Sequence, residues 1–74
     1  MAPSIGRIVL YRKPKSEDPH GCWHAAIITR VWTRVSVNLT VFLDAASPVF
    51  RTEVARQDIA ESEGPCWEWP PRVE

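Results

Sequence analysis

Apolar and polar side chains alternate most clearly over residues 22–43 of this chain. Within residues 35–43 every second side chain is Val or Leu, and the positions between them hold Ser, Asn, Thr and Phe. A period of two is typical of a β-strand with one buried face. Residues 22–32 form another largely apolar run, separated from the first only by Thr33 and Arg34. The pattern therefore predicts an antiparallel hairpin.

Three further short strands are predicted from the same kind of pattern, over residues 5–12, 49–56 and 66–69. Residues 13–21 hold two prolines, a glycine and several charged side chains, so they predict an exposed loop. Residues 57–64 are acidic and predict a turn or a single helical turn. The remaining breaks in the pattern coincide with prolines, which cannot donate a hydrogen bond to a sheet.

Five short strands with polar connections and almost no helix signal predict an all-β fold, a small five-stranded antiparallel SH3-like barrel. Residues 1–74 are expected to form one domain. A chain this short buries only about 60–65% of the surface that its unfolded form exposes, so its stability is expected to be marginal.

Charge is balanced overall but divided between the two halves of the chain. Residues 1–43 carry six Lys or Arg against two Asp or Glu, and residues 44–74 carry three against seven. A general nucleic-acid binder needs a net basic surface, so we do not expect that activity. The division suggests either association of copies into a homo-oligomer or mutual neutralisation within one barrel. No signal peptide or membrane-spanning run is evident, which predicts a soluble intracellular protein without a membrane partner.

Two cysteines, Cys22 and Cys66, lie far apart in the sequence. In a reducing compartment we expect free buried thiols, with a disulfide as the alternative. Alternation of His20, Cys22 and His24 would place three metal-ligand side chains on one face of an extended segment, with Cys66 as a fourth. The spacing lacks the C-x-x-C of most structural zinc sites, so we predict no metal and no cofactor.

Several segments together resemble a known group of proteins. They are G-R-I-V-L-Y at residues 6–11, A-A-I-I-T-R-V at residues 25–31 and W-E-W-P-P-R-V at residues 67–73. The combination resembles a family of small uncharacterised bacteriophage proteins with a C-terminal W-x-W-P-x-R-V tail. This chain departs from the family at Cys66, which follows Gly-Pro where the family runs Gly-Thr or Gly-Ser, and at Glu68, where the family has histidine. The resemblance implies a phage or prophage origin, a compact β fold and a location in the host cytoplasm, and it implies no settled activity.

Tryptophan and arginine are the strongest chemical signal, because an indole stacks on rings and a guanidinium binds phosphate or carboxylate bidentately. Trp67 and Trp69 should share one face of a strand, and the alternative is that this face is core. A short barrel could also gather Arg7, Arg12, Arg30 and Arg34 into an anion-binding patch. The predicted ligand-binding residues are Tyr11, Trp23, Trp32, Trp67, Trp69, Arg7, Arg30 and Arg72.

No nucleophile, base and orienting acid occur in a recognisable arrangement, and no glycine-rich phosphate loop is present, so we predict no enzyme activity. The sequence favours a phage-encoded, non-catalytic binding protein with one aromatic and cationic pocket. Its ligand would be a small anionic aromatic molecule such as a host nucleotide immune signal, by analogy with small phage proteins that capture such signals. The alternatives are an SH3-like protein-interaction module that docks on a host or virion protein, and a structural accessory protein.

Overall fold

A computed structural model describes residues 2–43, 47–60 and 64–70 of the chain. Regular structure in those residues is entirely β. The strands are β1 (Ile8–Arg12), β2 (Trp23–Val31), β3 (Ser36–Phe42), β4 (Val49–Ala55) and β5 (Cys66–Glu68). The predicted all-β class with five strands is confirmed, and each strand lies within the range expected from the alternation.

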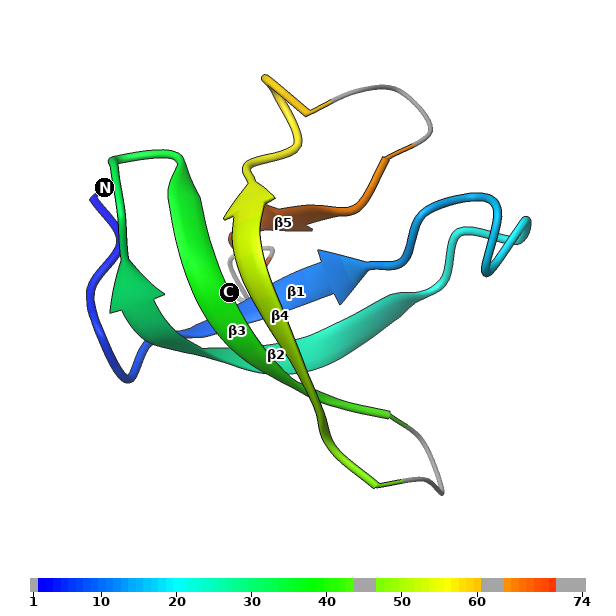
Figure 1. Ribbon diagram of the computed structural model, residues 1–74, viewed down its shortest axis with the longest axis horizontal. Helices are drawn as coiled ribbons and strands as arrows, with labels where there is room; N and C mark the ends of the chain where they lie inside the picture. The colour runs from blue at the N-terminus through cyan, green and yellow to red at the C-terminus, as the bar shows by residue number, and fades with distance from the viewer. Residues whose placement is uncertain (1, 44–46, 61–63, 71–74) are drawn as a thin grey trace.

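The strands form one antiparallel sheet in the order β4-β3-β2-β1-β5. The first four follow one another as a meander, and β5 then returns to pair with β1, so the sheet curls into a half-barrel (Figure 1). The chain just after β4 bridges β5, where Arg56 lies opposite Trp67 and the Gln57 N–H donates to the Trp67 carbonyl at 2.8 Å. These contacts draw the two edge strands together at one end of the sheet.

The start of β1 is set by Gly6. Gly6 has a positive φ of 90°, which a glycine adopts without steric cost. The Arg7 N–H donates to the Ser4 carbonyl at 3.2 Å, which closes a turn before the strand begins at Ile8. Residues 5–7, predicted as strand, therefore lie outside β1.

A bulge interrupts the pairing of β3 with β4. Val37 pairs with Val54 and Leu39 pairs with Arg51, so two residues of β4 lie opposite Asn38 alone. One of the two is Glu53, with a positive φ of 51°. The extra residue shifts the alternation along β4.

Inward-facing side chains of all five strands form one hydrophobic core. Alternate positions of β3 supply its centre, as the period of two predicted. The largest fully buried side chains are Trp67 and Tyr11, which are paired across β5 and β1. The core residues are Val9, Tyr11, Ala26, Ile28, Val37, Leu39, Val41, Val54 and Trp67.

Two connections are tightly organised. In the loop between β1 and β2, the Asp18 carboxylate accepts hydrogen bonds from the backbone N–H groups of His20 at 3.0 Å and Cys22 at 3.2 Å. After β4, the Ala60 N–H donates to the Arg56 carbonyl at 2.9 Å and closes a turn, one of the two alternatives predicted for residues 57–64, of which residues 61–63 lie outside the described residues. The loop prediction for residues 13–21 is likewise confirmed.

Candidate binding surface

Arginine and tryptophan meet in three separate pairs. In each pair the guanidinium carbon lies within 5.5 Å of an indole centroid, close enough for a cation–π interaction. The pairs are Arg7 with Trp69 at 5.5 Å, Arg12 with Trp23 at 5.3 Å and Arg30 with Trp32 at 4.0 Å. Arginine and tryptophan therefore do lie together, as the sequence suggested, but they do so at three separate sites and not in one pocket.

Trp32 is an exposed indole whose ring nitrogen is hydrogen-bonded. It directly follows β2 and remains 45% exposed. Its Nε1–H donates to the Asn38 Oδ1 atom at 2.7 Å, and the same oxygen accepts the Glu53 N–H at 2.9 Å. Arg30 covers part of the ring from the neighbouring outward position. Asn38 therefore fixes the orientation of Trp32 through the bulge in β4.

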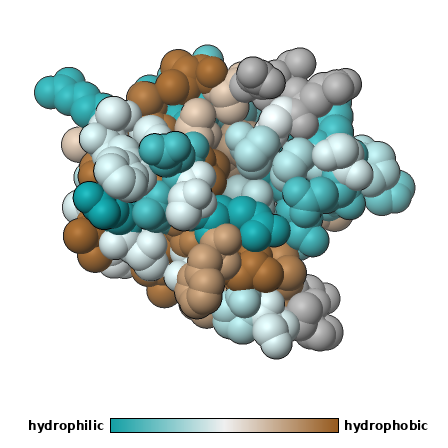
Figure 2. Space-filling model, in the orientation of Figure 1, coloured by the Kyte–Doolittle hydropathy of each residue, from teal (hydrophilic) through white to brown (hydrophobic). Residues whose placement is uncertain are grey.

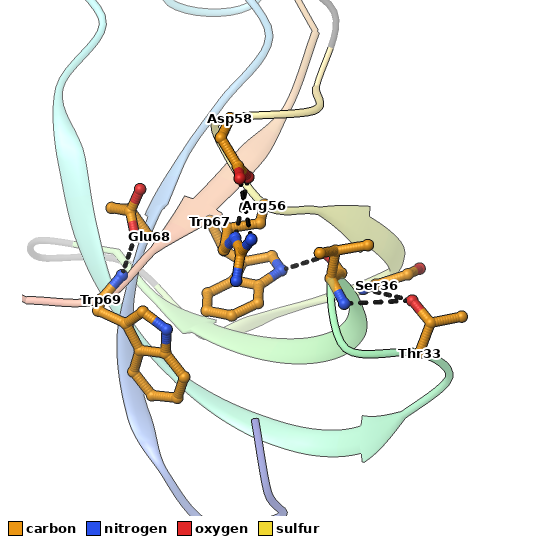
Figure 3. A network of polar contacts seen from close by, with 8 residues as sticks. Thr33, Ser36, Arg56, Asp58, Trp67, Glu68 and Trp69 are labelled. Atoms are coloured by element: carbon orange, nitrogen blue, oxygen red, sulfur yellow. Dashed lines mark hydrogen bonds and ion pairs between the residues drawn. The ribbon is translucent and has the colours of Figure 1, made fainter. Parts of the chain in front are cut away.

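The turn after Trp32 is held by its own side chains. The Thr33 hydroxyl oxygen accepts hydrogen bonds from the N–H groups of Val35 at 3.2 Å and Ser36 at 3.0 Å, part of the network in Figure 3. The Trp32 N–H donates to the Ser36 carbonyl at 2.9 Å. Threonine hydroxyls commonly replace backbone groups in this way in tight turns. These hydrogen bonds hold the turn of residues 32–36 together.

A hollow of about 310 Å³ opens beside this turn, lined by Ala2, Arg34, Val35 and Arg56. The guanidinium of Arg56 donates to both carboxylate oxygens of Asp58, at 2.8 and 2.9 Å (Figure 3). These bonds raise the pKa of Arg56 and lower that of Asp58. Arginine is suited to phosphate or carboxylate, and Arg34 and Arg56 both line the hollow, although Asp58 already accepts two of the Arg56 hydrogen bonds.

Another hollow, of about 260 Å³, lies between the end of β4 and the residues before β5. Its lining is mainly small or apolar and includes one carboxylate, from Glu53, without a cation. The lining residues are Glu53, Ala55, Ile59, Ala60, Gly64 and Pro65. It lacks the charge that an anionic ligand needs.

Tyr11 and Trp67 are core residues, which corrects their assignment to a ligand surface. Both are fully buried, because a barrel of this size needs its largest rings to fill the interior. Trp67 donates its Nε1–H to the Val35 carbonyl at 3.0 Å. Its ring meets Trp69 edge to face, with centroids 5.2 Å apart, and Trp69 is partly buried against the core. The alternative that this face is core is therefore the one observed.

The single aromatic pocket expected from the sequence is not formed. Trp23 begins β2 and Trp32 follows its end, so the two indoles lie at opposite ends of a strand whose backbone is roughly 30 Å long at about 3.3 Å per residue. The loop of residues 13–21 leads through Cys22 into Trp23, and Arg12 lies over the ring of that tryptophan. Arg72, also predicted as a ligand residue, lies outside the described residues.

The cysteines are both free, as predicted. Cys66 is buried and desolvation raises its pKa, although the nearby Arg12 guanidinium opposes the shift. Cys22 is exposed, which corrects the expectation of two buried thiols.

Three buried polar atoms have no hydrogen-bond partner among the described residues: Tyr11 Oη, His24 Nε2 and Arg12 Nε. Tyr11 and His24 are directly paired across β1 and β2. Desolvation raises the pKa of Tyr11, while nearby Arg51 opposes that shift. Arg51 in turn forms an ion pair with Glu17 of the β1–β2 loop at 3.8 Å. Tyr11, His24 and the Arg51–Glu17 ion pair therefore form a second group of polar side chains, beside the β1–β2 loop.

Within the described parts of the chain, no three His, Cys, Asp or Glu side chains are grouped as a metal site would require. No helix there is long and apolar enough to cross a bilayer. No profile of a known protein family matches the chain, and no curated protein or solved structure shows significant similarity to it. The likeness to phage proteins stays a prediction from the motifs.

Asn38 and Arg56 are the surface residues that the sequence analysis missed. Asn38 stood out only as a polar position within an alternating strand, and Arg56 as the end of another. Their roles depend on pairings between distant segments, Asn38 with Trp32 and Glu53, and Arg56 with the hollow beside Val35. A local pattern carries no signal for either.

Proposed function

We propose that this protein is a non-catalytic binding module that takes a small anionic ligand at the end of the barrel formed by the β2–β3 turn. The observation that carries the proposal is that one turn, residues 32–36, presents the exposed Trp32, whose ring is oriented by Asn38, and also supplies Arg34 and Val35 to a hollow that Arg56 lines. Rigid aromatic rings and arginines are the side chains that most often dominate binding energy.

The chemistry of the turn indicates the class of ligand. Arg34 suits the oxygens of a phosphate or carboxylate, Arg56 adds the N–H groups that Asp58 does not engage, and Arg30 adds positive charge beside the indole. A planar ring stacked on Trp32 would complete the recognition. A nucleotide has both parts, and the hollow of about 310 Å³ falls at the lower end of the range for small-molecule sites.

The phage resemblance and the fold support the biological setting of this proposal. A phage-encoded module in the host cytoplasm would use such a site to sequester a nucleotide immune signal of the host. We assign the half-barrel to the SH3-like class, because its strand order β4-β3-β2-β1-β5 is a meander of four strands closed by a fifth against the first. Fold alone does not carry the function, which rests on the turn.

A thermal-shift screen with cyclic dinucleotides, linear nucleotides and cyclic ADP-ribose compounds tests the proposal. At about 100 times Kd, a ligand adds about 2.7 kcal/mol to the free energy of unfolding. For a domain of this size that corresponds to a rise in Tm on the order of 10 °C. Trp32→Ala and Arg34→Ala should each abolish most of the shift, whereas Trp23→Ala at the other end of β2 should leave it unchanged. A screen without any shift, or a shift insensitive to Trp32→Ala, would overturn it.

A second candidate is an SH3-like module that docks on a host or virion protein. The specific observation in its favour is Trp23, which is exposed beside the loop between β1 and β2 with Arg12 against its ring. SH3-type domains bind proline-rich segments in aromatic-lined grooves. Peptide binding that is lost in Trp23→Ala and retained in Trp32→Ala would favour this candidate.

A further inference from the structure

The outward side of the sheet carries two rows of apolar side chains. In an antiparallel sheet, directly paired residues share a face, so the register identifies each row. One row runs Phe50, Thr40, Ile27, Ile8 across β4, β3, β2 and β1. The next runs Phe42, Ala25, Leu10 across β3, β2 and β1 and ends at Glu68 on β5, at the margin of the apolar surface. The apolar surface consists of the seven residues before Glu68. We call these seven residues the outer face. Thr40 is its only polar member, and none of the seven is charged.

The outer face is open to solvent although it is apolar. Phe50 is 77% exposed, Ile8 61% and Phe42 44%, while Leu10 and Ile27 are half-buried. In Figure 2, apolar side chains reach the surface beside the grey segment at the lower right, where β3 ends and β4 begins. Large exposed apolar side chains that adjoin one another commonly mark an interaction site.

The bulge in β4 explains how this surface arises. Val49 packs against the core and Val54 is buried, although the two positions differ by an odd number of residues. Glu53 absorbs the extra step, so Phe50 points outward while Val54 points inward. The most exposed large hydrophobic side chain among the described residues, Phe50, thus lies on the outer face while Val54 remains in the core.

We propose that the outer face is the interface of a two-fold homodimer. A second copy is the partner whose chemistry matches, because the seven side chains of the outer face are uncharged and predominantly apolar, so that this face complements itself, while the charged Glu68 lies at its margin. The chain has nine Lys or Arg and nine Asp or Glu, so two copies carry no net charge that would keep them apart. Two twisted sheets pack face to face in this way in β-sandwiches, about 10 Å apart.

The size of the face is sufficient for such a pair. Fully exposed aromatic side chains present about 150–250 Å², so the exposed parts of the face amount to on the order of 500 Å² per copy. A pair then buries about 1,000 Å², the lower bound for a specific interface. That size predicts a dimer that dissociates on dilution. Because a 74-residue domain buries only a modest fraction of its surface on folding, covering the outer face in a dimer would add to its stability.

Sedimentation velocity of the full chain from about 1 to 300 μM tests the proposal. We expect the mass to approach twice the 8.4 kDa of one chain with increasing concentration. Phe50→Glu and Ile8→Glu, at opposite edges of the outer face, should each weaken association at least 30-fold. Ile59→Glu is the matched control, because Ile59 is 57% exposed but lies in the turn after β4. Circular dichroism establishes that each variant is folded.

A wild-type mass of 8.4 kDa at all concentrations would overturn the dimer, and this result needs no variant. So would a dimer that Phe50→Glu and Ile8→Glu leave intact, because another surface would then be the interface. Isotope-filtered NOEs between labelled and unlabelled wild-type chains should connect outer-face side chains, and their absence in a dimer would also exclude this face. The ligand proposal is tested separately, since a monomeric Phe50→Glu chain keeps Trp32, Arg34 and Arg56.

Discussion

At the scale of single residues, the four tryptophans show that one side-chain type serves several purposes in one small fold. Trp67 fills the core and donates to the Val35 carbonyl. Trp69 packs edge to face on it. Trp23 and Trp32 are exposed at the two ends of β2, each with an arginine against its ring. Strand position, and not residue type, decides between core and surface.

Replacement of Trp67 tests its place in the core. Trp67→Phe removes buried volume and the hydrogen bond to Val35, so we expect a loss of about 2–4 kcal/mol in the free energy of unfolding. Trp23→Phe is the control, and its effect should stay within about 0.5 kcal/mol. Urea unfolding followed by far-UV circular dichroism measures both. Equal effects of the two substitutions would contradict the assignment of Trp67 to the interior.

At the scale of elements, the bulge between β3 and β4 is the feature that shapes the surface. At the bulge the Glu53 N–H donates a hydrogen bond to the Asn38 side chain, which also accepts one from Trp32. The register on either side of the bulge leaves Phe50 facing outward. A backbone irregularity of one residue therefore contributes both to the proposed ligand site and to the proposed dimer interface. Bulges are commonly retained where a strand has to redirect a side chain.

Glycine substitution tests the strain at Glu53. A non-glycine residue in the left-handed region costs about 1–2 kcal/mol, whereas glycine loses about 0.5–1 kcal/mol through the entropy of the unfolded chain. Glu53→Gly should therefore be neutral or stabilising by up to about 1 kcal/mol. Thr52→Gly, at an ordinary φ in the same strand, should destabilise by about 1 kcal/mol. Chemical denaturation of the two variants decides the point, and equal losses would mean that Glu53 is not strained.

Much of the fold was predictable at this scale and the bulge was not. The strands followed from the period of two in residues 35–43 and from the prolines and glycines between segments. The face that Phe50 occupies did not, because a strict alternation from Val49 onward places Phe50 and Val54 on the same side. Only the pairing of Val37 with Val54 and of Leu39 with Arg51 reveals the extra residue.

At the scale of the whole molecule, the sheet gathers charge and apolar surface in ways that composition does not reveal. Arg34 and Arg56, from opposite halves of the sequence, meet beside one hollow. The ion pair of Glu17 with Arg51 likewise joins the two halves, as expected if they neutralise each other within the barrel. The predicted single pocket failed because the length of β2 separates Trp23 from Trp32, a constraint that appears only when strands are assembled.

Stability should decline at alkaline pH. Desolvation raises the pKa of Tyr11 and of Cys66 in the folded state. The unfolded chain then loses these protons first, so stability is complete below the unfolded pKa values, about 8.5 for cysteine and 10 for tyrosine, and is lost as pH rises through the folded values. Urea unfolding between pH 7 and about pH 10.5 measures the decline. Cys66→Ala should flatten its first part, and an unchanged slope in that variant would contradict the burial of the thiol.

Because β1 lies between β2 and β5, one of the earliest segments to be synthesised obtains its second neighbour from one of the last. The pairing of Leu10 with Glu68 cannot form until β5 has been synthesised. The same holds for the hydrogen bond from the Gln57 N–H to the Trp67 carbonyl. Until residues 66–68 have left the ribosome, the nascent chain holds an incomplete sheet with an unpaired strand edge, an arrangement prone to aggregation. Folding is therefore expected to await the emergence of these residues, and products of premature termination before residue 66 should be short-lived in the cell.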